Sequence, residues 1–338
     1  MSPRQRTPAQ MRCMVLEVPG TDLVARERAV PQPGPGQVCI RVLACGVCRT
    51  DLHLRDGELP DPKMPVIPGH EVVGEVDALG EGVRDLAPGQ RVGVAWLGWA
   101  CGECEHCRAG RENLCQRARF TGYTLDGGYG QYMLADAGYV VPVPERYEAA
   151  AAAPLLCAGL IGFRAYRLAG EEARRIGLYG FGAAAHILCQ VAVHEQRQVF
   201  AFTRPGDERG QRFARELGAH WAGGSDRPPP VPLDAALIFA PVGALVPAAL
   251  EAVRPGGTVV CAGIHMSAIP SFPYRLLWRE RVLRSVANLT RADGRDFMQL
   301  AARTPIQTRT HTYRLADANA ALEDLRQGRF DGAAVLVP

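Results

Sequence analysis

Apolar residues in the first half of the chain come in short runs of strand length. The runs VCIRVLA, EVVGEVDALG and RVGVAWLG are separated by the turn-forming segments PQPGPGQ, VIPGH and LAPGQ. Short apolar runs bounded by proline and glycine are typical of β-strands joined by tight turns. The first half is therefore predicted to form a small, irregular β-barrel.

The pattern changes near residue 149. An alanine-rich stretch over residues 149–170 predicts a helix, and strand-like and helix-like segments then alternate. Strands are expected at RIGLYGF, QVFAFT, DAALIFA and GTVVCAGI, and helices at AAAHILCQVAVHE and RGQRFARELG. Because strands that alternate with helices build a parallel sheet, the second half is predicted to be a doubly wound α/β domain.

The domain boundaries follow from this change of pattern. The segment RPPPVPL (227–233) is expected to be a loop inside the α/β domain, and the pattern loosens after about residue 290. The final VLVP is predicted to be a strand that returns to the first domain. We therefore expect a catalytic domain over 1–154 and 290–338, with a cysteine-rich lobe at 96–118, and an α/β domain over 155–289.

Composition adds little to this picture. The chain has 338 residues, 47% of them apolar and 22% charged, as in ordinary globular proteins. A net charge of +3 gives no indication of a nucleic acid or a membrane surface as partner. No apolar run approaches the ~18 residues of a membrane span. The polar N-terminal segment MSPRQRTPAQMR lacks the apolar stretch of a secretory signal and is predicted to be a short disordered leader.

Four cysteines lie within one short segment, CGECEHCRAGRENLC, as Cys101, Cys104, Cys107 and Cys115. Two-residue gaps let the backbone turn back, so that successive sulfurs can converge on one ion. Four thiolates in a tetrahedron are a structural site that zinc prefers. The alternative is a set of buried or disulfide-bonded cysteines. We favour zinc, because eleven cysteines, clustered thiols and no export signal together indicate a reducing cytoplasm.

The first strand of the α/β domain runs into the sequence GFGAAA, which matches the G-x-G-x-x-A form of the dinucleotide-binding fingerprint. Gly180 permits the tight turn, and Gly182 lets the backbone approach a pyrophosphate. Ala185 permits close packing of the following helix, whose N-terminus favours an anion. A strand before the fingerprint and a helix after it make nucleotide binding the favoured interpretation.

The choice between NAD and NADP depends on the end of the next strand. NAD-binding domains usually carry an acidic residue there, which binds the ribose hydroxyls. This strand ends in Thr203-Arg204, and the first carboxylate after it is Asp207. Arg204 could pair with a 2′-phosphate, although an exposed loop arginine is the simpler explanation. The sequence therefore favours NADP(H) over NAD(H) only modestly.

Three further residues have the chemistry of a second zinc site. Cys48 lies in CGVCRTDLH, His70 in VIPGHEVVG and Cys157 in APLLCAG. Two thiolates and a neutral imidazole balance Zn²⁺ and leave a fourth position open, as catalytic zinc requires. Each residue alone also has a structural explanation: Cys157 as a small buried residue and His70 as a turn histidine.

Taken in order, these segments resemble the zinc-dependent medium-chain alcohol dehydrogenases. The likeness covers nearly the whole chain from about residue 12. It includes GVCRTDLH, PGHEVVGEV, the four-cysteine lobe, APLLCAG, the G-x-G fingerprint and the C-terminal LADANAALEDLRQGRFDGAAVLV. The resemblance implies a GroES-like β-barrel catalytic domain, a Rossmann cofactor domain, and a homodimer or homotetramer.

The resemblance also implies roles for individual residues. Cys48, His70 and Cys157 would bind catalytic zinc, and the four clustered cysteines would bind structural zinc, giving two zinc ions per chain. Thr50 and His53 correspond to the proton relay of the family, and an imidazole exchanges protons near neutral pH. The resemblance further implies that Arg49 contacts the pyrophosphate and that Asp51 orients His70. It places the Glu71 carboxylate near the metal, and Trp96 and Leu97 in the substrate pocket.

The chain departs from the family pattern at three places. Ala183 and Ala185 stand in the fingerprint where many members have glycine, which tightens the turn but keeps the side chains small. Ala333 stands where members often have a second cofactor-binding arginine, so pyrophosphate binding would depend more on Arg49. Thr203 replaces the acidic residue of NAD-specific members.

The implied activity is the reversible oxidation of a small or medium, mainly apolar alcohol to an aldehyde or ketone, with hydride transfer to NAD(P). In this reaction Thr50 takes the alcohol proton by hydrogen bond, and His53 passes the proton to solvent. One alternative is a zinc- and nucleotide-binding protein without dehydrogenase activity. Another is a zinc-independent quinone or enoyl reductase of the same fold. A protein without dehydrogenase activity would not need to keep both the zinc ligands and the relay residues. Zinc-independent reductases of this fold lack the zinc ligands, so the dehydrogenase is favoured. The physiological substrate and the reaction direction stay open.

Overall fold

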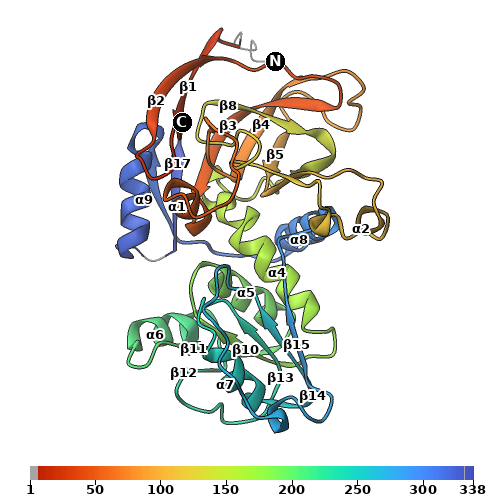
Figure 1. The fold of residues 1–338 in the computed structure, drawn as a ribbon, viewed down its shortest axis with the longest axis vertical. Coiled ribbons are helices and arrows are strands. Elements are labelled where there is room, and N and C mark those ends of the chain that lie inside the picture. Colours follow the sequence, from red (N-terminus) through yellow and green to blue (C-terminus); the bar gives the residue numbers. More distant parts are fainter. Residues whose placement is uncertain (1–6, 331) are drawn as a thin grey trace. The chain divides into compact units, whose positions relative to one another are not determined.

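The computed structural model describes residues 7–330 and 332–338, and the chain divides into two compact units (Figure 1). Unit 1 comprises Met1–Cys157, Leu289–Ala302 and Gln307–Pro338, and unit 2 comprises Ala158–Asn288 and Arg303–Ile306. Residues 1–6 of the predicted leader lie outside the described residues. Its last three residues, 10–12, are already part of a strand, β1 (Gln10–Val15), so the leader is shorter than predicted.

A seven-stranded sheet forms the framework of unit 1. Its order is β16-β17-β3-β4-β5-β9, with β8 paired to β3, and β1 pairs separately with β2. The C-terminal strand β17 pairs antiparallel with β3, as predicted for the returning end of the chain. The other strands of the sheet and β2 are bounded as β2 (Val24–Ala29), β3 (Gln37–Val47), β4 (Glu71–Leu79), β5 (Arg91–Val94), β8 (Tyr132–Asp136), β9 (Val140–Pro142), β16 (Thr310–Arg314) and β17 (Ala333–Val337).

The cysteine-rich lobe is an excursion from this sheet. The predicted strand RVGVAWLG is in fact two strands, β5 and β6 (Leu97–Trp99), because the chain leaves the sheet after Val94. β6 pairs antiparallel with β7 (Arg119–Phe120), which closes the base of the lobe. Between them lie the short helix α2 (Glu105–Arg108) and a 3-10 turn, η1 (Glu112–Leu114).

Helices complete unit 1. They include α1 (Arg49–Arg55), which follows β3 directly, α8 (Arg291–Arg303) and α9 (Ala318–Gln327). In Figure 1 the red N-terminal strands and the blue α9 and β17 belong to the same unit. The core of the unit gathers apolar side chains from both ends of the chain, among them Leu16, Ile40, Tyr129, Leu322 and Leu336.

Unit 2 is a six-stranded parallel sheet of order β12-β11-β10-β13-β14-β15. Numbered along the unit, this is the 3-2-1-4-5-6 order of a doubly wound dinucleotide-binding sheet, which places the switch in direction between β10 and β13. The strands are β10 (Arg175–Tyr179), β11 (Gln198–Thr203), β12 (Trp221–Gly224), β13 (Leu233–Ile238), β14 (Val253–Cys261) and β15 (Val282–Ser285).

The helices of unit 2 are α4 (Ala158–Leu168), α5 (Ala183–His194), α6 (Glu208–Glu216) and α7 (Leu245–Ala252). The single helix predicted over residues 149–170 is broken. It begins as α3 (Ala149–Ala152), continues as a 3-10 turn, η3 (Ala153–Leu156), and resumes as α4 after Cys157. Proline lies in the first turn of η3, and Cys157 has non-helical dihedral angles, φ −125° and ψ −73°. Residues 228–232 form the predicted proline-rich loop, and Leu233 already belongs to β13.

The apolar helices of the chain are short. Among the described residues, no helix on its own combines the length and the apolar character needed to cross a membrane. Ala149–Leu156 and Ala158–Leu168 satisfy both criteria only as a bent pair, and by length and composition alone. Several side chains of this pair, such as Leu155, Leu156 and Leu160, are fully buried in the protein.

Candidate functional site

The junction between β3 and α1 fixes the first predicted zinc ligand. Cys48 is the N-cap residue of α1, and its Sγ accepts a hydrogen bond from the backbone N–H of Thr50 at 3.3 Å. Its own backbone N–H donates to Oδ2 of Asp51 at 2.9 Å. These two bonds form a reciprocal capping box, which orders the first helical turn. The thiol, the Thr50 amide and the buried Asp51 carboxylate are thereby held in one turn.

Four potential ligand atoms converge at this turn. They belong to Cys48, His70, Glu71 and Cys157, and all of them lie within 4.8 Å of one another. The Cys48 Sγ is 3.1 Å from Nε2 of His70. His70 and Glu71, at the start of β4, are 1% and 3% exposed. Cys48 and Cys157 are half-buried. Residues far apart in the sequence thus form one cluster within unit 1.

The Asp51 carboxylate lies beside the imidazole of this cluster. Its Oδ1 lies 3.5 Å from Nδ1 of His70 and accepts the backbone N–H of Gly69 at 3.3 Å. The ring of His70 also packs edge-on against Trp96, with the ring centroids 4.9 Å apart. A carboxylate behind one ring nitrogen directs the other nitrogen to a metal in many zinc sites. Here that other nitrogen, Nε2, faces the Cys48 thiol.

The ionisable groups of the cluster shift one another's pKa values. The hydrogen bond from Cys157 and the neighbouring His70 lower the pKa of Cys48 well below its usual value. The same bond and burial raise the pKa of the Cys157 thiol well above its usual value. Burial and the Cys48 charge likewise raise the pKa of Glu71. One thiolate therefore suppresses ionisation of the other acids, because like charges repel at low dielectric.

The donor set fits zinc. Two sulfurs, an imidazole nitrogen and a carboxylate oxygen are ligand types that Zn²⁺ accepts. A divalent cation between them would favour the ionised forms of these groups. With Cys48, His70 and Cys157 as ligands, a tetrahedral zinc site would keep a fourth position open.

The four-cysteine lobe forms a second, separate group. Its four Sγ atoms lie within 4.8 Å of one another. The Cys101 Sγ is 3.8 Å from that of Cys107 and 3.5 Å from that of Cys115. A tetrahedron with zinc–sulfur bonds of about 2.3 Å has edges of about 3.8 Å. The sulfurs are therefore already spaced for one zinc ion, and four thiolates leave no open position.

Backbone amides prepare the lobe for a cation. Hydrogen bonds from the amides of Glu103 and Cys104 lower the pKa of Cys101 to about 5. Burial and the neighbouring thiols raise the pKa of Cys107 to about 12. The lobe is tied to the rest of unit 1 by Arg291, whose backbone N–H and Nε donate to Oε1 of Glu112 at 2.9 and 3.1 Å.

The fingerprint lies at the carboxyl end of β10, beside the switch point of the sheet. Gly180 has φ +87°, and a Cβ on it would come within 2.8 Å of Ala240. Gly182 is the N-cap of α5, and none of the described atoms lies within 4 Å of its Cβ position. Ala185 is fully buried, and Ala183 is partly exposed in the first turn of α5. This turn has the open backbone and the helix N-terminus that a pyrophosphate needs.

The end of β11 lacks an available carboxylate. Thr203 is 4% exposed, and its hydroxyl donates to the backbone carbonyl of Arg204 at 3.1 Å. Arg204 is exposed. Asp207 is the N-cap of α6, where its Oδ1 accepts the backbone N–H of Gly210 at 2.8 Å. The first acidic side chain after the strand therefore already has a structural role.

The predicted relay and pocket residues fall into two groups. Thr50 and His53 are partly exposed on α1, close to Cys48 in sequence, and Arg49 is exposed at the start of the same helix. Leu97 is 2% exposed and lines a small cavity of about 70 Å³ together with Ala95, Tyr139, Val141 and Arg291. None of the predicted ligands Cys48, His70 and Cys157 lines that cavity, whereas Trp96 packs against His70, so Leu97 and Trp96 face different surroundings.

Two aromatic residues and one acid were not anticipated from the sequence. Trp96 stacks on Phe120 and Tyr123, with ring centroids 5.2 and 5.6 Å away. These rings continue the apolar wall that Trp96 presents beside His70. Nδ1 of His53 contacts the carboxylate of Glu58. The sequence signals were an aromatic pair just after the lobe and an Asp-Gly turn just before Glu58.

Comparison with known proteins agrees with this geometry. Residues 34–145 match the model of the alcohol dehydrogenase GroES-like domain. The "Probable alcohol dehydrogenase AdhA" of Mycobacterium tuberculosis (strain CDC 1551 / Oshkosh) is 47% identical over 315 residues, which is 91% of this chain and 90% of that protein.

Two solved structures are similar over almost the whole chain. A cobalt- and zinc-bound thermostable alcohol dehydrogenase from Pyrobaculum aerophilum has a TM-score of 0.86 at 27% identity, covering 97% of this chain and 100% of its own. Acetophenone reductase from Geotrichum candidum NBRC 4597, in complex with NAD, has a TM-score of 0.87 at 27% identity, covering 99% of both chains. The chain, with its GroES-like and Rossmann units, therefore belongs to the zinc-dependent medium-chain alcohol dehydrogenase family.

Proposed function

We propose that this alcohol dehydrogenase uses a zinc ion held by Cys48, His70 and Cys157, together with a nicotinamide cofactor held by the fingerprint of unit 2. The observation that carries the proposal is the convergence of the four ligand atoms within 4.8 Å, next to Thr50 on the same helical turn. The zinc-bound structure from Pyrobaculum aerophilum supports the choice of metal. The spacing of the lobe sulfurs supports a second, structural zinc ion.

The side chains around the cluster supply binding, orientation and proton transfer. Zinc, when bound, supplies a Lewis acid that makes an alcohol hydroxyl more acidic. Asp51 holds the ring of His70, so that Nε2 stays directed at the cluster. The Thr50 hydroxyl would accept a hydrogen bond from the alcohol and take its proton, and His53 would deliver that proton to solvent. The N-terminus of α5 would hold a pyrophosphate, and the family resemblance adds Arg49 as a pyrophosphate contact.

Replacing His53 with glutamine should slow alcohol oxidation mainly at low pH. There hydroxide is scarce, so removal of the alcohol proton depends on the relay. We expect a fall of roughly 10²-fold at the acid end and a much smaller fall at high pH, as for loss of a general base. The check is a pH profile of kcat for both proteins; profiles of the same shape would remove His53 from the relay.

We propose a modest preference for NADP(H), because β11 ends at Thr203, Arg204 follows it, and Asp207 caps a helix. Replacing Arg204 with glutamine should raise the KM for NADPH by about tenfold and leave the KM for NADH unchanged, since a charge-assisted hydrogen bond contributes about 1.5–3 kcal/mol. Arg212→Gln, at an exposed ion pair on α6, is the control. A clear NADH preference of the unaltered protein would contradict the proposal; the NAD complex of acetophenone reductase makes that comparison necessary.

We propose small or medium, mainly apolar alcohols and aldehydes as substrates. The rings of Trp96, Phe120 and Tyr123 offer an apolar wall beside His70, and sugars would lack polar partners there. The experiment is a panel of alcohols and aldehydes assayed with NAD(H) and NADP(H). Cofactor turnover with apolar members supports the proposal. No turnover across the panel would favour a protein that binds zinc and nucleotide without dehydrogenase activity, and turnover of quinones or enoyl compounds by zinc-free protein would favour a reductase.

We also propose a homodimer or homotetramer in the cytoplasm. β15 is the edge strand of the six-stranded sheet, and nearby Tyr274, Trp278 and Val282 are 67%, 58% and 44% exposed. An open edge with large exposed apolar side chains is suited to pairing with another chain. Free thiols at all eleven cysteines suit a reducing compartment. Residues 1–154 with 290–338 serve as the catalytic domain, and residues 155–289 as the cofactor domain.

A further inference from the structure

A carboxylate contacts the histidine of the proposed relay. Oε2 of Glu58 lies against Nδ1 of His53, and the side chains are 55% and 21% exposed. The backbone of the same residues is also joined, because the N–H of Glu58 donates to the carbonyl of His53 at 2.9 Å. The chain thus turns back after α1 and returns the Glu58 carboxylate to the helix it has just left.

The turn that carries Glu58 is fixed by its own backbone. The N–H of Asp56 donates to the carbonyl of Leu52 at 2.8 Å, and that of Gly57 donates to Leu54 at 3.2 Å. Gly57 has φ +78°, a left-handed conformation that side chains disfavour. The position of the Glu58 backbone relative to His53 is therefore determined by α1 itself.

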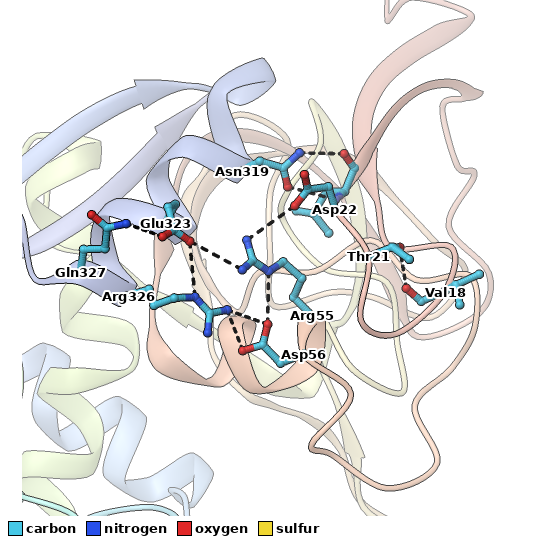
Figure 2. A network of polar contacts seen from close by, with 10 residues as sticks. Val18, Thr21, Asp22, Arg55, Asp56, Asn319, Glu323, Arg326 and Gln327 are labelled. Atoms are coloured by element: carbon cyan, nitrogen blue, oxygen red, sulfur yellow. Dashed lines mark hydrogen bonds and ion pairs between the residues drawn. The ribbon is translucent and has the colours of Figure 1, made fainter.

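Ion pairs with α9 hold the same turn from outside (Figure 2). A guanidinium nitrogen of Arg326 lies 2.6 and 2.7 Å from the two carboxylate oxygens of Asp56. Arg55 reaches Glu323 at 3.9 Å and Asp22 at 3.8 Å. The hydrogen bond to Asp56 and the charges of Asp56, Glu323 and Glu58 raise the pKa of Arg326. The turn that precedes Glu58 is thus held by ion pairs with α9, and the charge of Glu58 lies near this network.

The contact determines which nitrogen of the ring carries a proton. A carboxylate only accepts hydrogen bonds, and a neutral imidazole has a single N–H. The contact with Glu58 therefore places that hydrogen on Nδ1 and the lone pair on Nε2. A base whose ring is oriented by a third group is the usual arrangement of an efficient proton acceptor.

We propose that Glu58 is a positioning residue of this dehydrogenase, which holds His53 as the Nδ1–H tautomer so that Nε2 accepts the relayed proton. The proposal rests on the proposed function, because it assigns His53 to the relay. The carboxylate touches neither substrate nor cofactor in this role.

The tautomer can be measured without any turnover. In protein labelled with ¹⁵N-histidine, His53 should give the shifts of an Nδ1–H ring, with the signal assigned from its loss in His53→Gln. In Glu58→Ala the signal should move to the Nε2–H tautomer, which free imidazole side chains prefer. In Glu58→Gln it should stay, because the amide oxygen still accepts from Nδ1; this variant also replaces Glu58→Ala if the latter fails to fold.

The kinetic arm uses the single-turnover rate of cofactor reduction by an alcohol. Glu58→Ala should lower this rate by about tenfold with the KM of the alcohol unchanged, as a misplaced proton acceptor predicts. Glu58→Gln should lower it less. Glu323→Gln removes another carboxylate of the same network and should change neither the rate nor the tautomer.

Three results would overturn the proposal. The first is an Nδ1–H tautomer that persists in Glu58→Ala, and the second is an unchanged single-turnover rate despite a tautomer change. The third is a tautomer change in a protein that shows no alcohol-dependent cofactor reduction at all. In that case the contact is real but the proposed function is wrong, and the relay role of Glu58 is rejected with it.

Discussion

Replacing Cys48 with alanine is expected to abolish turnover while leaving the protein folded. The Sγ of Cys48 is one of the four converging atoms. The neighbouring groups lower the pKa of the Cys48 thiol well below its usual value. Lewis-acid catalysis contributes several kcal/mol, and each 1.36 kcal/mol is a factor of ten. The rate should therefore fall by roughly 10³-fold or more. The check combines steady-state kinetics with circular dichroism and the zinc content of each protein.

The same substitution of Cys48 should have only a small effect on stability. Loss of the N-cap sulfur of α1 should cost about 1 kcal/mol of stability, as for other helix caps. Cys39→Ala is the matched control, because Cys39 is a buried thiol on β3, the strand that ends just before Cys48, and lies outside both cysteine clusters. It should keep its activity. Substantial activity in Cys48→Ala would refute the ligand role of that residue.

Replacing Cys104 with serine should lower thermal stability before it affects chemistry. The lobe has little apolar core, and α2 has no buried residue, so the lobe depends on its four sulfurs for its shape. In such small units the free energy of zinc binding contributes directly to folding. Its apparent value is about 10 kcal/mol or more in isolated zinc fingers. Even a loss of about 4 kcal/mol would lower the Tm by roughly 6 °C in a protein of this size.

The measurement is calorimetry of Cys104→Ser, with kcat determined well below the transition. Glu103→Gln is the control, because it breaks an exposed ion pair with Arg117 in the same lobe. Exposed ion pairs contribute little, so its Tm should stay within about 2 °C. A Tm of Cys104→Ser equal to that of the unaltered protein would mean that the lobe does not hold a structural ion.

Local spacing made the lobe predictable, whereas the second cluster needed the resemblance. Cys101, Cys104 and Cys107 are close in sequence, so short turns alone can bring their sulfurs together. Cys48, His70 and Cys157 are brought together by β3, β4 and the break after η3. No periodicity in the sequence encodes that convergence, because it depends on the pairing of strands. Only the order of motifs along the chain indicated it.

The elements that sequence patterns missed have weak or mixed signals. β12 reads WAGG, which is short and rich in glycine, and β15 reads VLRS with mostly exposed side chains. Both pair in the parallel sheet because their neighbours fix their place. The break at Cys157 was hidden by a continuous alanine-rich run, although Pro154 marked it.

The contact of Glu58 with His53 could not be predicted from the sequence either. The dipeptide Asp56-Gly57 predicts a turn, but the direction in which the next side chain points depends on the hydrogen bond from Glu58 to His53. Residues on α9, distant in sequence, then hold that turn. Such contacts of a predicted relay residue become visible only in three dimensions.

The central claim is that the chain holds two zinc ions with different tasks. The most direct measurement is the zinc content per chain of the unaltered protein, Cys48→Ala and Cys104→Ser, with alcohol-dependent cofactor reduction assayed on the same samples. The account predicts about two, one and one ions per chain, for one open and one closed site, with activity lost only in Cys48→Ala. Zinc-free protein that still reduces the cofactor with an alcohol would contradict it.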